Sequence, residues 1–77
     1  MVVVRYAGGD EIIKGAQEGT IGSIVEGLVL MHGGWQNIDG FIFSKVEDRY
    51  AITVFKDGKQ YYYVYEVVKE VPVSKGV

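Results

Sequence analysis

The sequence predicts a small all-β domain of about five strands. Two runs rich in β-branched and aromatic residues flank Asp57-Gly58, a third such run covers residues 40–46, and the N-terminal stretch VVVRY provides a fourth. Several of the 11 glycines lie between these runs, where turns are needed. A chain of 77 residues has room for one domain. We expect that domain to cover residues 1–71, followed by a flexible C-terminal tail at residues 72–77.

Two stretches outside the central hairpin have the composition of strands. The N-terminal VVVRY predicts a buried or edge strand, because consecutive valines favour extended backbone. GFIFSKV, from Gly40 to Val46, follows the turn-like residues 37–40 and predicts a second strand.

The segment from Gly19 to Glu26 fits two structures. Its apolar residues recur at helical spacing, and Ser23 to Glu26 has the form of a capping box, yet Gly-x-x-Gly-x-Ile-Val-Glu also resembles a turn that enters a strand. A helix over residues 10–31 would contain four glycines, each costing roughly 1 kcal/mol relative to alanine. A long helix is therefore disfavoured. Two alternatives remain for this segment: a strand, or a short helix near residues 23–32 that ends at Gly33-Gly34. The helix would make the fold α+β.

The C-terminal half predicts a β-hairpin around Asp57-Gly58, the dipeptide favoured in two-residue hairpin loops. This turn places one almost wholly apolar set of side chains on a face that we expect to be core. A one-residue slip through a bulge at Gly58 would regroup the two faces. The expected partners are Lys56 with Lys59, Val54 with Tyr61, Ile52 with Tyr63 and Tyr50 with Tyr65. The other face would carry Ala51, Thr53, Phe55, Gln60, Tyr62 and Val64.

Four short segments occur in an order shared with a known class of barrel: Gly-Asp-Glu-Ile at 9–12, Gly-Thr-Ile-Gly-Ser-Ile-Val-Glu at 19–26, Tyr-Ala-Ile-Thr-Val-Phe-Lys-Asp-Gly-Lys at 50–59 and Val-Val-Lys-Glu-Val at 67–71. Together they resemble small Src-homology-3-like barrels of the KOW and related kinds. The resemblance implies a closed barrel and favours the strand for the contested segment. The chain departs from it at residues 27–39, which are expected to hold an extra hairpin or a short helix.

Composition and charge disfavour several classes of protein. The chain has no cysteine, which removes disulfides, thiolate zinc sites and cysteine nucleophiles. Its net charge of -2, with basic residues scattered as singletons, makes general nucleic-acid binding unlikely. No apolar run is long enough for a signal peptide or a membrane span, so we expect a cytoplasmic protein without a membrane partner.

Catalytic, metal and cofactor chemistry is weakly represented. His32 is the only histidine and lies beside Gly33-Gly34, so it predicts a loop or packing residue rather than a general base. Asp39 and Asp57 each precede a glycine, as turn residues do. The sequence contains neither of the phosphate-binding motifs Gly-x-Gly-x-x-Gly and Gly-x-x-x-x-Gly-Lys-Ser/Thr. We therefore expect no cofactor, no metal and no enzyme activity.

Aromatic density is the remaining signal. The chain has six tyrosines, three phenylalanines and one tryptophan, more than one face of one hairpin can bury. Trp35, Phe55 and Tyr62 are the predicted binding residues, because tyrosine and tryptophan combine large contact area with a polar group. We expect a non-catalytic protein-binding or self-associating module, with regulation or inhibition of a larger assembly as one such role. The alternatives are a KOW-like nucleic-acid accessory domain and a small oligomeric enzyme whose site is shared between chains.

Overall fold

A computed structural model describes residues 1–70 of the chain. The predicted tail at residues 72–77 lies outside the described residues. Five strands, one α-helix and two short 3₁₀ helices follow one another along the chain: β1 (Val2–Gly9), η1 (Lys14–Ala16), β2 (Glu18–Thr20), α1 (Ile21–Met31), η2 (Trp35–Asn37), β3 (Gly40–Val46), β4 (Arg49–Lys56) and β5 (Lys59–Glu70).

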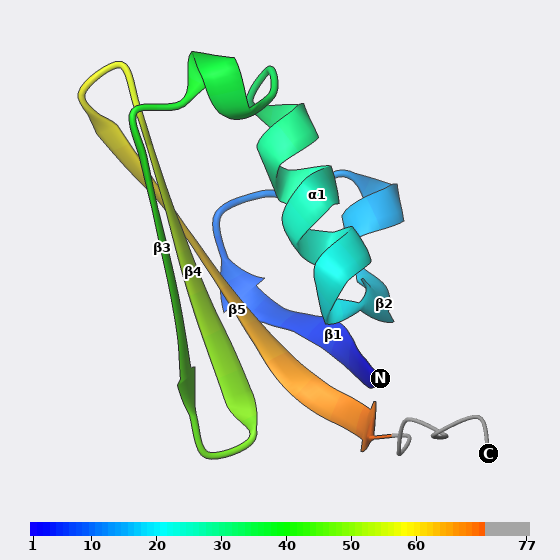
Figure 1. The fold of residues 1–77 in the computed structure, drawn as a ribbon. Coiled ribbons are helices and arrows are strands. Elements are labelled where there is room, and N and C mark those ends of the chain that lie inside the picture. The colour runs from blue at the N-terminus through cyan, green and yellow to red at the C-terminus, as the bar shows by residue number, and fades with distance from the viewer. Residues whose placement is uncertain (71–77) are drawn as a thin grey trace, which may run out of the picture.

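The five strands form one antiparallel sheet in the order β2-β1-β5-β4-β3 (Figure 1). The predicted predominance of strands is confirmed, and so is their number. Within the described residues, the edge strands β2 and β3 are not paired with each other, so the sheet is open and the closed barrel implied by the resemblance is not observed. The molecule is elongated, measuring 46 × 24 × 23 Å.

The strand predicted at Gly19 to Glu26 is not observed. Helix α1 occupies most of this segment, so the short-helix alternative is the correct one. Ile24 and Leu28 lie one turn apart and are both buried against the sheet. Burying each of these side chains stabilises the fold by roughly 1.5–3 kcal/mol, which outweighs the cost of Gly22 and Gly27 within the helix. Tertiary packing therefore decides a segment whose local pattern is ambiguous.

Both ends of α1 are defined by side-chain and glycine chemistry. Thr20 caps the N-terminus: its hydroxyl oxygen accepts a 3.3 Å hydrogen bond from the Ser23 backbone N–H. The cap thus lies three residues before the Ser23 of the predicted capping box. At the other end, Gly33 and Gly34 have φ values of 97° and 96°, which stops the helix where the sequence predicted.

The register of the β4–β5 hairpin agrees with the sequence prediction, from Lys56 opposite Lys59 to Tyr50 opposite Tyr65. Asp57 and Gly58, the two loop residues, have φ values of 52° and 77°, as a two-residue hairpin turn needs. The apolar face of this hairpin forms part of the hydrophobic core, as predicted. Its fully buried members from the two strands are Ile52, Val54, Tyr63 and Tyr65, joined by Val4 of β1 and by Ile24 and Leu28 of α1.

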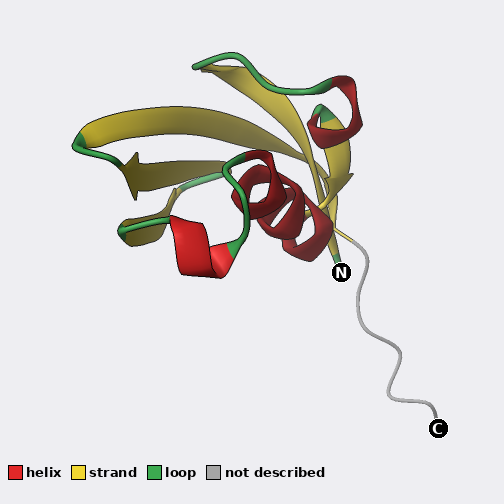
Figure 2. Cartoon of the chain, turned by 90° about the horizontal axis from the view of Figure 1, so that it is seen from above, coloured by secondary structure: helices red, strands yellow, loops and turns green. Residues whose placement is uncertain are grey.

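The fold has two layers, because α1 and η1 lie on one face of the curved sheet (Figure 2). Residues 27–39, expected to hold a hairpin or a short helix, contain the end of α1 and the single turn η2. The turn between β3 and β4 lies far from α1, so the helix leaves one end of this hairpin uncovered (Figure 1).

Replacing Gly58 by valine is expected to lower the free energy of unfolding by about 2 kcal/mol, because a β-branched residue resists a positive φ. Gly58→Asn is the matched control and should cost less than about 1 kcal/mol, since asparagine accepts this conformation. Both effects can be measured by urea unfolding followed by circular dichroism. Equal stability of the valine variant and the natural protein would contradict the turn geometry.

Candidate functional site

The face of the sheet opposite α1 carries a second set of side chains that no helix covers. Because successive residues of a strand point to opposite faces, this set alternates with the core residues. We call this surface the open face. Its apolar and aromatic side chains are Ile42, Val46, Ala51, Phe55, Tyr62 and Val64.

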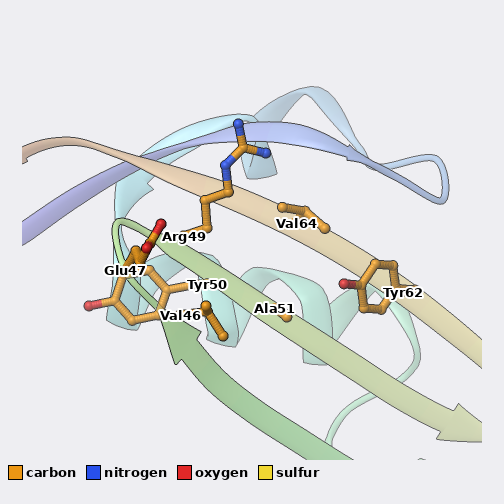
Figure 3. A pocket seen from close by; sticks show the side chains of 7 residues that line it. All are labelled: Val46, Glu47, Arg49, Tyr50, Ala51, Tyr62 and Val64. Carbon is orange, nitrogen blue, oxygen red and sulfur yellow. The ribbon is translucent and has the colours of Figure 1, made fainter.

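A shallow hollow of about 330 Å³ lies on the open face (Figure 3). Ala51 of β4 and Val64 of β5 are cross-strand partners and form its floor, while Tyr62 borders one side. The cross-strand neighbours of these two floor residues are also small: Ser44 faces Ala51 from β3, and Gly8 faces Val64 from β1. The floor of the hollow is apolar, as is typical of binding pockets.

Two charged residues, Glu47 and Arg49, line the hollow beside the β3–β4 turn. Glu66 of β5 lies opposite Arg5 of β1 and Arg49 of β4. Its carboxylate accepts a 2.6 Å hydrogen bond from the Arg5 guanidinium. This bond, with the charges of both arginines, lowers the pKa of Glu66. Arg49 lines the hollow and can reach a polar group of a bound molecule.

Tyr62 is fixed in place through its backbone. Asp10 takes the position of a strand residue beside it: the Asp10 N–H donates to the Tyr62 carbonyl at 2.8 Å, and the Asp10 carboxylate accepts from the Tyr62 N–H at 2.8 Å. Gly9 allows this approach, because a Cβ at Gly9 would lie 2.2 Å from the Tyr62 carbonyl oxygen. The Tyr62 ring is still 48% exposed, so an anchored strand presents a free aromatic side chain.

The three predicted binding residues lie on two different surfaces. Phe55 and Tyr62 share the open face, at diagonal positions of β4 and β5. Trp35 lies on η2 and packs edge-to-face on Phe41, with ring centroids 5.2 Å apart. Phe41 faces Val54 of the core, so this contact is on the helix side of the sheet. Trp35 therefore does not join Phe55 and Tyr62 in one cluster, and the binding role of each stays a prediction.

His32 is part of the packing between helix and sheet. Its Nε2 lies 2.7 Å from the Tyr63 hydroxyl oxygen in a buried contact, and its ring centroid is 4.5 Å from that of Tyr61. Its carbonyl accepts a 2.7 Å hydrogen bond from the Lys56 ammonium. Burial and the Lys56 charge lower the pKa of His32, against an opposing effect of Asp10. The neutral ring thus holds the end of α1 to β5 and does not face the hollow.

Neither a metal centre nor a membrane span emerges from the described part of the chain. Within residues 1–70, no three histidine or carboxylate side chains gather as metal ligands would. The helices described there are too short or too polar to cross a bilayer. The sequence matches no protein-family model, and comparisons with characterised proteins and with solved structures found no significant match.

The hollow was not predicted from the sequence, although Ala51, Tyr62 and Val64 were expected on one face. The missing information was the register of β3 on β4, which brings Val46 opposite Arg49 and Ser44 opposite Ala51. Residues 47–48 form that turn without the Asn-Gly or Asp-Gly signal, so the sequence did not indicate which residues of β3 would join the open face.

Gly9→Ala is expected to destabilise the fold by about 3 kcal/mol, because the added methyl group would overlap the Tyr62 carbonyl and force β1 away from β5. Gly15→Ala is the control, since a Cβ there would meet no atom within 4 Å. Thermal unfolding of both variants measures the difference. Similar melting temperatures would show that Asp10 and Tyr62 are not held in this arrangement.

The protein is expected to lose stability as the pH falls below the ordinary His32 pKa of 6.5. The folded-state pKa is lowered, so the unfolded chain binds the proton first, and the stabilisation is complete only above 6.5. Urea unfolding at about pH 7.5 and about pH 5.5 tests this, in a range that leaves ordinary carboxylates ionised. His32→Gln should flatten the dependence; an equally steep loss in that variant would assign it to another group.

Proposed function

We propose that this chain is a non-catalytic protein-binding module that uses the open face of its sheet. The observation that supports the proposal most is the one-sided cover of the sheet: α1 packs on one face, while the other presents apolar and aromatic side chains around a hollow. Exposed apolar area gathered on one face, with charged residues at its border, is typical of protein interaction sites.

The hollow would act as the anchor pocket for one apolar side chain of the partner. Tyr62 offers an aromatic ring and a hydroxyl at its border, and a tyrosine in such a position contributes strongly to binding because it loses little conformational entropy. Phe55 extends the apolar area along β4. Arg49 would pair with a carboxylate or a backbone carbonyl of the bound segment.

A protein partner is favoured over a nucleic acid by the charges near the hollow. Arg5 donates its hydrogen bond to Glu66, and Arg49 is the one basic side chain among the described residues that line the hollow. Phosphate backbones are bound by clusters of basic side chains, and the net charge of the chain is -2. The relation to Src-homology-3-like barrels stays a prediction, and the proposal does not depend on it.

A catalytic role is the less favoured alternative. Its best candidate, His32, is engaged with the Tyr63 hydroxyl between helix and sheet, on the opposite side from the hollow. A small protein with one binding face acts by occupying a surface of its partner. Regulation or inhibition of a larger assembly is a role of that kind.

Tyr62→Ala is expected to weaken partner binding by about 2 kcal/mol or more, roughly thirtyfold, and to leave the fold intact. The matched control is Leu30→Ala, because Leu30 is 71% exposed on α1, away from the open face. The partner can be isolated from the source cells with the natural chain as bait, and its affinity for each purified variant measured by calorimetry. Equal affinity of the Tyr62→Ala variant, or equal loss with Leu30→Ala, would contradict the proposal.

A further inference from the structure

Strand β3 forms one edge of the sheet and has the features of an edge that pairs with another strand. It spans seven residues, GFIFSKV, and pairs with β4 in one continuous register without a bulge. Edge strands are normally protected by proline, bulges, short length or several charges. Of these protective features β3 has only one charged residue, Lys45. The side chains of Ile42 and Phe43 are 53% and 44% exposed.

The hydrogen bonds of the neighbouring strands determine which residues of β3 direct their backbone groups toward the free edge. Tyr62 uses its N–H and carbonyl toward Asp10, so its cross-strand partner Thr53 directs its own groups away from β5 and toward β3. Thr53 lies opposite Ile42. Ile42 is therefore bonded within the sheet, and the alternate residues Phe41 and Phe43 direct their N–H and carbonyl groups to the free edge.

We propose that β3 pairs antiparallel with β3 of a second copy of this chain, with Ile42 on the two-fold axis. In this register Phe41 lies opposite Phe43 of the second copy, and Phe43 opposite its Phe41. The outward backbone groups of these residues then form hydrogen-bonded pairs across the axis. The inference concerns a different surface from the open face and goes beyond the proposed function.

Charge complementarity favours this register over an axis at Phe43. With Ile42 on the axis, Lys45 of each copy lies opposite Asp39 of the other. A shift of the axis to Phe43 would instead bring Asp39 opposite Glu47, a like-charge pair that disfavours that alignment. Asp39 accepts a hydrogen bond from the Asp57 N–H through one carboxylate oxygen, and a carboxylate has capacity for further donors.

Aromatic packing supports the same arrangement on the helix side of the sheet. Phe43 already stacks on Tyr50, with ring centroids 5.2 Å apart, and Trp35 contacts Phe41 at the same centroid distance. Placing Phe43 of one copy beside Phe41 of the other joins these two pairs into one cluster. Trp35, which is 56% exposed, would then lie at the border of a continuous apolar interface.

The first experiment measures the mass of the full chain by sedimentation equilibrium and maps the register by disulfide formation. The chain has no cysteine, so single variants report one position each. Ile42→Cys should cross-link under a mild oxidant such as diamide, because non-hydrogen-bonded partners have Cα atoms about 4.5 Å apart, within disulfide range. Ser44→Cys is the matched control, exposed on the same face, with the two copies of residue 44 about 13 Å apart along the strands.

A concentration-dependent dimer that cross-links through Ile42→Cys and not through Ser44→Cys supports the proposal. A monomer at all concentrations overturns it, and so does cross-linking through Ser44→Cys to an equal or greater yield. A monomeric result would leave the binding role of the open face standing, so failure of the two proposals can be told apart.

A charge reversal tests the register independently of cysteine. Lys45→Glu places like charges opposite each other at two symmetry-related positions and should weaken dimerisation about tenfold. Lys69→Glu makes the same charge change on exposed β5 and should leave the dimer unchanged. Circular dichroism confirms that both variants fold. Equal dimerisation of the two variants would rule out the contact between Lys45 and Asp39.

Discussion

The register of β4 on β5 determines which side chains face the helix and which face solvent. Asp57 and Gly58 fix it, because a two-residue turn with two positive φ values permits only one alignment of the strands. A shift of β5 by one residue would move Tyr61, Tyr63 and Tyr65 from the core to the open face. The hydrophobic core and the candidate binding surface therefore depend on the same turn.

Buried tyrosines convert this register into fixed positions for the helical layer. The Tyr65 hydroxyl donates a 2.7 Å hydrogen bond to the carbonyl of Ala16 in η1, and the Tyr63 hydroxyl meets His32 at the end of α1. Burial raises the pKa of each tyrosine to about 12, so both hydroxyls keep their protons under ordinary conditions. Each ring fills core volume while its polar end holds the end of a helical element against the sheet.

The predictable parts of the fold were those fixed by local chemistry. The Asp57-Gly58 turn gave the hairpin partners, and Gly33-Gly34 gave the end of the helix. The helix itself depends on Ile24 and Leu28 meeting the sheet, which local pattern cannot reveal. Phe55 and Tyr62 were correctly assigned to one face, whereas the place of Trp35 depends on where η2 packs, and its contact with Phe41 spans two elements.

The pairing of β1 with β5 joins the first described strand along the chain to the last one, and this has a consequence for the order of folding. Residues 2–9 find their main partner only in residues 63–70, whereas β3, β4 and β5 pair with their neighbours in sequence. Local hairpins form quickly, while contacts between distant segments must first overcome the entropy of closing a long loop. During synthesis the apolar N-terminal valines can pair only with the short strand β2 until β5 has been made. The β3–β4–β5 meander is the part of the sheet that can assemble first and then receive β1.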